Sequence, residues 1–158
     1  MLASTFYSLT NDQPSFFQEL KDKPELIPKA IDEMLRFRFH IAARERICTK
    51  DNDLLGVDVK KGQIVKVWMS AANMDKEKFE DPFTLNIHRS TNKQHLTFGN
   101  GPHFCLGAPL AKMEIEHTLK AFIEVFEGIE AIKNFDLEAN LTKAAAGQTL
   151  THLPVRLF

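Results

Sequence analysis

The sequence predicts a mainly α-helical fold with small β-sheets, an α+β arrangement. Apolar residues recur at three- and four-residue spacing early in the chain and again after residue 108. Two short runs that look like strands lie between these stretches, and a long coil follows them. With 158 residues, 44% of them hydrophobic, the chain is long enough to bury one core. We therefore treat residues 1–158 as a single unit.

Helices are expected over residues 14–39. Asp12 is placed to cap the first of them, Pro14 lies in its first turn, and Pro24 interrupts it. Pro28 then opens a second helix. The apolar positions of the pair are Phe16, Phe17, Leu20, Ile31, Leu35 and Phe39.

Small strands are expected between residues 44 and 68, at 44–49 and 63–68, with turn formers such as Gly56 and Gly62 between them. Residues 75–108 form a coil that ends in a glycine-rich loop around Cys105, and a coil of this length is usually functional. A helix over 109–127 follows, which Gly128 is expected to stop. Its apolar stripe is Ala111, Ile115, Leu119, Phe122 and Phe126. The tail, 151–158, has the alternation of a terminal strand.

The charge balance excludes several partner classes. Lysine plus arginine is 20 and aspartate plus glutamate is 21, so neither nucleic acid nor an anionic membrane is an expected partner. No apolar run is long enough to span a bilayer, and the first residues do not resemble a signal peptide. Two cysteines, Cys48 and Cys105, do not make a disulfide framework, which favours the cytoplasm.

The loop from Phe98 to Pro109 carries the chemistry. It places Cys105 between glycines and directly before a helix N-terminus. Glycines permit unusual backbone angles and close approach, and the helix dipole and free amide groups favour an anion there. A cysteine in this position is expected to form a thiolate and bind a metal, with Phe98 and Phe104 shielding its sulfur from water. Cys48 has no such context and is expected to be structural.

The segment Phe98-Gly99-Asn100-Gly101-Pro102-His103-Phe104-Cys105-Leu106-Gly107 resembles the haem-binding signature of bacterial cytochromes P450. The resemblance extends along nearly the whole chain. Glu33-Met34-Leu35-Arg36 resembles the family's Glu-x-x-Arg motif, and Arg89, after Phe79-Glu80-Asp81-Pro82, resembles the arginine that joins that pair. Leu153-Pro154-Val155-Arg156-Leu157 resembles a family C-terminus.

The resemblance implies haem b as cofactor, with Cys105 as the axial ligand of its iron. It also implies that Arg46 and His103 donate to the haem propionates and that Phe98, Gly99 and Gly107 belong to the cofactor site. Glu33, Arg36 and Arg89 are expected to form a partly buried structural network. The stretches 39–43 and 144–149 correspond to segments that line the family's substrate pocket.

The function that the resemblance implies is that of a haem-thiolate monooxygenase, in which the complete enzyme inserts one oxygen atom from O2 into a small hydrophobic organic substrate. Electrons come from a ferredoxin, a flavodoxin or a reductase. Lys93, Lys112 and Lys120 lie near the thiolate side of the sequence, where an acidic donor could dock.

The resemblance covers only the C-terminal portion of the family's fold, and residues 1–10 look like the end of its long oxygen-binding helix. We therefore expect the isolated chain to be inactive and a separately encoded N-terminal half to be a possible partner. Apolar surface is expected to be bare on the helices of 14–39 and 109–127.

Other interpretations remain at this stage. The chain can be a truncated or split remnant without turnover, or a helical interaction module that uses residues 109–127 as its partner surface. A zinc site built from His95, His103 and Cys105 is disfavoured because the paired spacing of zinc ligands is absent. Gly99-Asn100-Gly101 does not fit a dinucleotide fingerprint, since Phe104 stands where the third glycine belongs.

Overall fold

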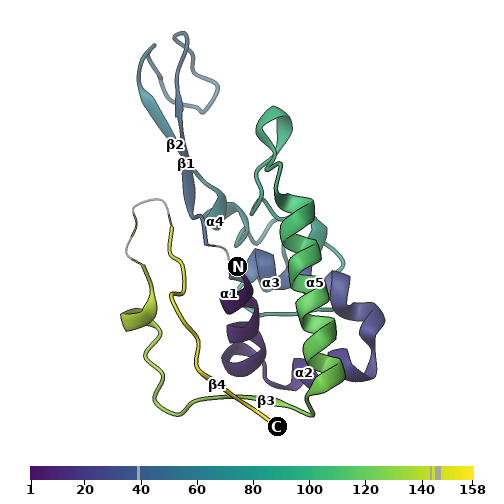
Figure 1. The fold of residues 1–158 in the computed structure, drawn as a ribbon. Coiled ribbons are helices and arrows are strands. Elements are labelled where there is room, and N and C mark those ends of the chain that lie inside the picture. Colours follow the sequence, from purple (N-terminus) through teal and green to yellow (C-terminus); the bar gives the residue numbers. More distant parts are fainter. Residues whose placement is uncertain (39, 143, 145–146) are drawn as a thin grey trace.

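The computed structural model describes residues 1–38, 40–142, 144 and 147–158. The expected mainly helical fold with small sheets is confirmed (Figure 1). Helices α1 (Leu2–Tyr7), α2 (Ser15–Asp22), α3 (Ile27–Phe37) and α5 (Ala108–Val125) make up the body of the molecule. A short helix, α4 (Met69–Ala72), follows the first sheet.

The N-terminal helices differ from expectation at their ends. A π-helical turn, Ser8–Asp12, continues α1, and a 3-10 turn, Pro24–Leu26, separates α2 from α3. The predicted cap at Asp12 is wrong, because Pro14 precedes α2 and no side chain caps it. Asp12 instead accepts a hydrogen bond from Nε of Arg38 at 2.8 Å. Phe39 lies outside the described residues.

Among the described residues, the sheets consist of two antiparallel strand pairs. Strand β1 (Ala43–Ile47) pairs with β2 (Ile64–Trp68), with Ala43 opposite Trp68, and this hairpin projects from the helical body in Figure 1. Gly56 and Gly62 have φ of 74° and 88° in its connection, angles that other residues rarely adopt. Strand β3 (Ile129–Ala131) pairs with β4 (Val155–Leu157), so the tail does form a terminal strand.

The segment between α4 and α5 is coil with two 3-10 turns, Asn92–Gln94 and Gly101–His103; a further 3-10 turn, Glu138–Asn140, follows β3. The expected stop of α5 at Gly128 is wrong, because the backbone becomes extended at Phe126. Gly128 serves a different purpose. A Cβ there would collide with the ring of Phe158, so the glycine makes room for the last residue.

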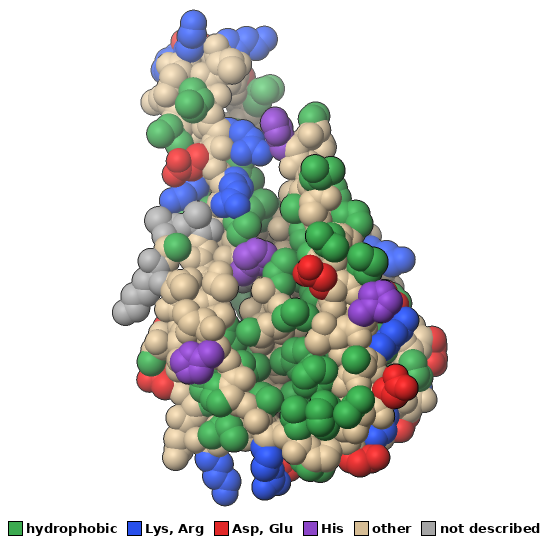
Figure 2. All heavy atoms as spheres, in the orientation of Figure 1, with side chains coloured by type: hydrophobic (Ala, Val, Ile, Leu, Met, Phe, Trp, Pro, Cys, Tyr) green, Lys and Arg blue, Asp and Glu red, His purple; other side chains and the backbone are tan. Residues whose placement is uncertain are grey.

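The core lies where α3 packs against α5 and α1, and its most deeply buried members include Leu9, Leu20, Ile31, Ile115 and Leu119. The expectation of bare apolar surface is confirmed for α5, where Leu110, Met113 and Val125 are exposed. Figure 2 shows hydrophobic side chains gathered on this face of the molecule. The same expectation is wrong for residues 14–38, a fully described stretch in which no large apolar side chain is exposed, because α2 and α3 bury theirs in the core. None of the helices in the described ranges is long and apolar enough to cross a membrane.

Candidate functional site

The cysteine loop is closed by its own backbone. The amide of Cys105 donates to the carbonyl of Phe98 at 2.9 Å, and the amide of Phe104 donates to the carbonyl of Gly101 at 3.0 Å. Gly99 and Gly101 have φ of 76° and 73°, which explains the requirement for glycine at both positions. The two ends of the loop, at Phe98 and Cys105, therefore lie side by side.

Cys105 is exposed, and α5 begins three residues after it. Gly107 has an ordinary φ of -82°, so the expectation that this glycine supplies an unusual angle is wrong. A Cβ there would lie 3.9 Å from the Cys105 sulfur, an ordinary van der Waals contact, so no close contact with the described residues requires glycine at this position. Phe98 is buried, but Phe104 is 53% exposed, so of the two expected shielding rings only Phe98 is packed into the core.

A cavity of about 560 Å³ opens beside Cys105, a volume typical of small-molecule and cofactor sites. The structure brings all the predicted cofactor residues onto its wall, namely Arg46, Phe98, Gly99, His103, Cys105 and Gly107. Its apolar lining includes Ile41, Met69 and Ala111. Figure 2 shows basic side chains and a histidine in the notch between the projecting hairpin and the cysteine loop.

Arg44 is a wall residue that sequence reasoning missed. Residues two apart on a strand face the same side, so the placement of Arg46 could have revealed it. Nη1 of Arg46 donates to the Glu45 carbonyl at 2.8 Å, and Nη1 of Arg44 donates to the Ala43 carbonyl at 3.4 Å. Within the described part of the chain neither guanidinium is paired with a carboxylate, and this suits a ligand that brings its own carboxylates.

His40 also borders the cavity, and its Nδ1 is buried without a hydrogen-bond partner among the described residues. Burial lowers the pKa of His40, and the positive charges of the N-terminus and Arg44 act in the same direction. A neutral imidazole with a free nitrogen, two arginines and a thiol therefore face one hollow that is otherwise largely apolar. These groups fit an iron porphyrin with its two carboxylates.

Glu33, Arg36 and Arg89 lie together, away from the cavity. Nη2 of Arg36 lies 2.8 Å from Oε1 of Glu33, and Nε of Arg89 lies 3.2 Å from the same oxygen. Nη1 of Arg36 also donates to the carbonyls of Asn73 and Pro82. The network therefore joins α3 to the coil that leads toward the cysteine loop.

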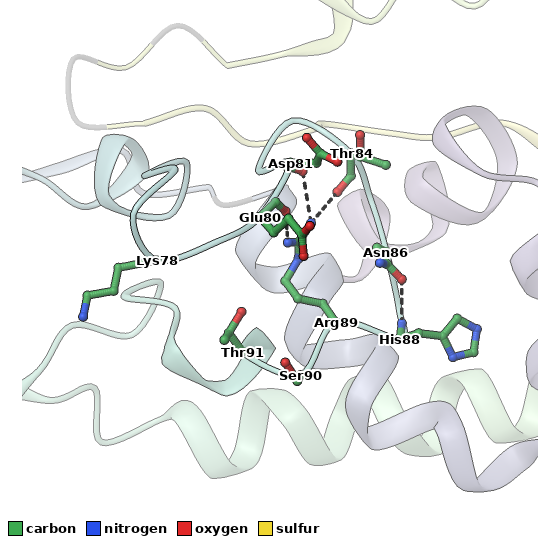
Figure 3. Close-up of a pocket in the computed structure, with 9 residues that line it drawn as sticks. All are labelled: Lys78, Glu80, Asp81, Thr84, Asn86, His88, Arg89, Ser90 and Thr91. Carbon is green, nitrogen blue, oxygen red and sulfur yellow. Dashed lines mark hydrogen bonds between the residues drawn. The ribbon is translucent and has the colours of Figure 1, made fainter.

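A separate polar hollow, also about 560 Å³, lies beside Arg89 (Figure 3). The guanidinium of Arg89 turns toward the backbone carbonyls of Glu80, Asp81 and Thr84. Lys78 and His88 point outward in opposite directions in Figure 3. The polar groups do not converge on a common point, so we do not regard this hollow as the site.

The lysines expected to meet an acidic donor are mostly engaged. Lys112 lies 2.5 Å from Asp32 and Lys120 lies 2.7 Å from Glu116. Among the residues that the structure describes, no group of three or more His, Cys, Asp and Glu side chains is arranged to hold a metal ion by itself.

A cysteine loop at a helix start, beside a cavity of cofactor size with basic side chains on its wall, is the arrangement expected of a haem-thiolate protein. The family model for cytochrome P450 matches residues 11–142. Cytochrome P450(MEG) of Priestia megaterium is 60% identical over 156 residues, which cover 99% of this chain and 38% of the relative. Cytochrome P450(BM-1) of the same species is 55% identical, again over 99% of this chain and 38% of the relative.

A crystal structure of CYP109E1 from Bacillus megaterium in complex with corticosterone has the same fold, with a TM-score of 0.89 and 37% identity, covering 98% of this chain and 41% of that one. The chain belongs to the cytochrome P450 family, whose members use haem. It spans about two fifths of the length of the relatives that it matches.

Proposed function

We propose that this chain supplies the thiolate side of a haem-thiolate monooxygenase. The observation that carries the proposal is the cavity that joins Cys105 to Arg44, Arg46 and His103 along an apolar wall. A thiol, three basic side chains and apolar surface are the groups that an iron porphyrin with two carboxylates requires.

Each wall residue has a defined task in this proposal. Cys105 binds the iron through its thiolate, and Arg46 and His103 donate hydrogen bonds to the propionates of haem b. Arg44 lies on the same face of β1 and adds a second positive charge toward them. Gly99 and Gly107 let the backbone approach the porphyrin closely, while Phe98 packs beside it and keeps water from the sulfur.

Bound haem supplies the activation of O2, from which one oxygen atom enters an organic substrate. The substrate is expected to be small and hydrophobic, and steroids are a sensible class to test because CYP109E1 was solved with corticosterone and with testosterone. His40 and Ile41 come from the first stretch expected to line the substrate pocket and do border the cavity. Of that stretch and of 144–149, residues 39, 145 and 146 lie outside the described residues.

The remaining partners are also proposals. Electrons are expected from a ferredoxin, a flavodoxin or a reductase of the cytoplasm. Because Lys112 and Lys120 are already paired, a donor that docks through lysines has to rely on Lys93 or displace one of these pairs. Turnover is expected of a protein as long as the relatives, formed for example with a separately encoded N-terminal half.

An absorption spectrum of the reduced, carbon monoxide-bound protein tests the haem site. We expect the purified 158-residue chain to bind haem and to show the long-wavelength Soret band of a thiolate-ligated iron. Turnover is then assayed with an electron donor, and separately with peroxide, on steroids, fatty acids and terpenoids. Coupled hydroxylation is expected only after a separately expressed N-terminal portion is added.

A second candidate function, a haem-free helical interaction module, is favoured by the exposed Leu110, Met113 and Val125 on α5. A chain that folds cooperatively, binds no haem and captures a partner through α5 would establish it. A chain that binds haem but shows no turnover even with an N-terminal half would instead be a non-catalytic remnant.

A further inference from the structure

Asp32 is a second buried carboxylate beside the Glu33 network, and it contacts a different part of the chain. Asp32 precedes Glu33 on α3, and successive helical residues point about 100° apart, so the two carboxylates face different neighbours. Asp32 is 4% exposed. Its Oδ1 lies 2.5 Å from Nζ of Lys112 on α5 and 3.6 Å from Nε2 of His95.

The hydrogen bonding of His95 fixes its proton. The backbone amide of Thr97 donates to Nδ1 of His95 at 3.2 Å, so that nitrogen is the acceptor and the proton of the neutral ring sits on Nε2. Nε2 is the nitrogen that faces Asp32, and the His95 side chain is itself buried. Asp32 therefore meets an N–H group from the coil and an ammonium group from α5.

The two donors stand at opposite ends of the cysteine loop. His95 precedes Phe98, whose carbonyl accepts the amide of Cys105, and Lys112 lies in the second turn of the helix that begins after the loop. The His95 ring and the Lys112 ammonium each lie 6.0 Å from the Phe98 ring centroid. One carboxylate thus contacts the segments that enter and leave the loop.

The segment that enters the loop is also anchored by the two residues between His95 and Phe98. Oγ1 of Thr97 donates to the carbonyl of Leu35 on α3 at 2.8 Å, and the amide of Leu96 donates to Oδ1 of Asn73 at 2.6 Å. On the other side of the loop, the charged Nζ of Lys112 donates a hydrogen bond to Asp32 on α3. Burial alone raises the pKa of Asp32, but the contacts with His95 and Lys112 together outweigh burial, so the pKa is lowered and the carboxylate stays charged.

We propose that Asp32 is a positioning residue for the Cys105 thiolate, which it orients by holding His95 and Lys112 at once. The carboxylate clamps both ends of the cysteine loop to α3 and so fixes the direction in which the sulfur points. The proposal depends on the proposed function only for the role of the thiolate as iron ligand. The clamp itself is a property of the chain with or without haem.

The test measures the loop directly by hydrogen exchange. In Asp32→Asn, which keeps the shape and removes the charge, we expect hydrogen exchange at the Cys105 amide to rise about tenfold, since charged hydrogen bonds are the stronger ones. Exchange at the amide of Leu119, in the core of α5, reports the stability of the fold and is expected not to change. Lys120→Met, which removes an exposed pair on the same helix, is the matched control and should change neither rate.

A second variant, Lys112→Met, removes the ammonium group that contacts Asp32. The Lys112 side chain is 40% exposed, so this substitution disturbs the core less than one at Asp32. If Asp32→Asn speeds exchange everywhere because the fold is weakened, this variant decides: faster exchange at Cys105 alone supports the clamp, and no change overturns it. An unchanged exchange rate at Cys105 in a folded Asp32→Asn protein also overturns it. In the haem-loaded chain we expect Asp32→Asn to lower the fraction that shows the thiolate Soret band. A parent chain without haem refutes the proposed function, while the exchange rates still decide on the clamp.

Discussion

Glu33 and Arg89 are separated by 56 positions, yet Oε1 of Glu33 accepts a hydrogen bond from Nε of Arg89 at 3.2 Å. The same oxygen accepts from Nη2 of Arg36 at 2.8 Å and from the amide of Asn86 at 3.0 Å. The side chains of Glu33 and Arg36 have no exposed surface. The buried Glu33 carboxylate therefore holds the coil around residues 86–89 against α3. Removing one of its donors would leave the negative charge of Glu33 buried without full compensation.

Arg36→Ala is expected to lower the free energy of unfolding by about 3–5 kcal/mol, because it strands the buried Glu33 carboxylate. Urea unfolding followed by circular dichroism measures the change. Arg156→Ala is the control, since the Arg156–Glu130 pair is exposed and such pairs contribute about 0–1 kcal/mol. Equal effects of the two substitutions would contradict a structural role for the network.

Cys105→Ser should abolish the long-wavelength Soret band of the reduced carbon monoxide complex, because a serine hydroxyl does not replace a thiolate on iron. The Cys48→Ser variant should keep the band. Cys48 lies in the hairpin connection, where its sulfur contacts the Lys50 carbonyl and the Asn52 amide group. Loss of the band in Cys48→Ser with the fold intact, or its persistence in Cys105→Ser, would disprove the assignment.

Arg46→Gln should speed the transfer of haem from the chain to apomyoglobin. The expected increase is about tenfold or more, since hydrogen bonds to charged groups contribute about 1.5–3 kcal/mol. Arg44→Gln should act in the same direction, because both side chains line the cavity. Arg156→Gln, remote from the cavity on β4, is the control for the loss of one positive charge. Retention of haem by Arg46→Gln and Arg44→Gln at the parent's rate would refute the propionate contacts.

The stability of the chain should depend on Asp32 at acid pH. His95 and Lys112 overcome the effect of burial and lower the pKa of Asp32 below its unfolded value of about 3.9. The unfolded state therefore takes up the proton first, so the stabilisation is complete above about pH 4 and is lost as pH falls through the folded pKa. We measure the Tm of thermal unfolding between about pH 4 and pH 2. The fall in Tm with decreasing pH should be less steep for Asp32→Asn and Lys112→Met than for the parent. Parallel slopes would contradict this linkage.

Association of the chain should weaken when α5 is made polar. Leu110 and Met113 are half exposed on its first turns, and exposed apolar groups of this kind favour pairing or aggregation. We expect Leu110→Gln combined with Met113→Gln to shift the chain toward monomer in sedimentation experiments. Leu54→Gln, at the exposed tip of the hairpin, is the control and should leave the distribution unchanged. A similar shift in both would mean that α5 is not a specific surface.

Local patterns in the sequence predicted α2, α3, α5, the β1–β2 hairpin and the terminal strand β4, but they predicted neither α4 nor β3. The apolar stripe from Ala111 to Phe126 predicted α5 to within two residues at its end, because helical periodicity is set by neighbours in the chain. The cap at Asp12 failed for the opposite reason. Its carboxylate is engaged by Arg38, and a tertiary ion pair of this kind has no signature in the local sequence.

Some features of the candidate site were likewise predictable from the sequence, and others were not. The glycine spacing around Cys105 identified the loop, and the family resemblance linked Glu33, Arg36 and Arg89, which do lie together in the fold. The contact of Asp32 with Lys112 spans 80 positions, and no motif links them, so His95 and Asp32 received no role from the sequence. Such contacts depend on how α3 and α5 pack, which the sequence pattern does not specify.

The closure of the cysteine loop by the Cys105 amide and the Phe98 carbonyl affects how a cofactor is acquired. A loop that is ordered by its own hydrogen bonds loses its conformational entropy when the chain folds, so little of that cost remains for the binding step. We therefore expect haem to enter a preorganised site, at a rate set by diffusion into the cavity rather than by local folding around it.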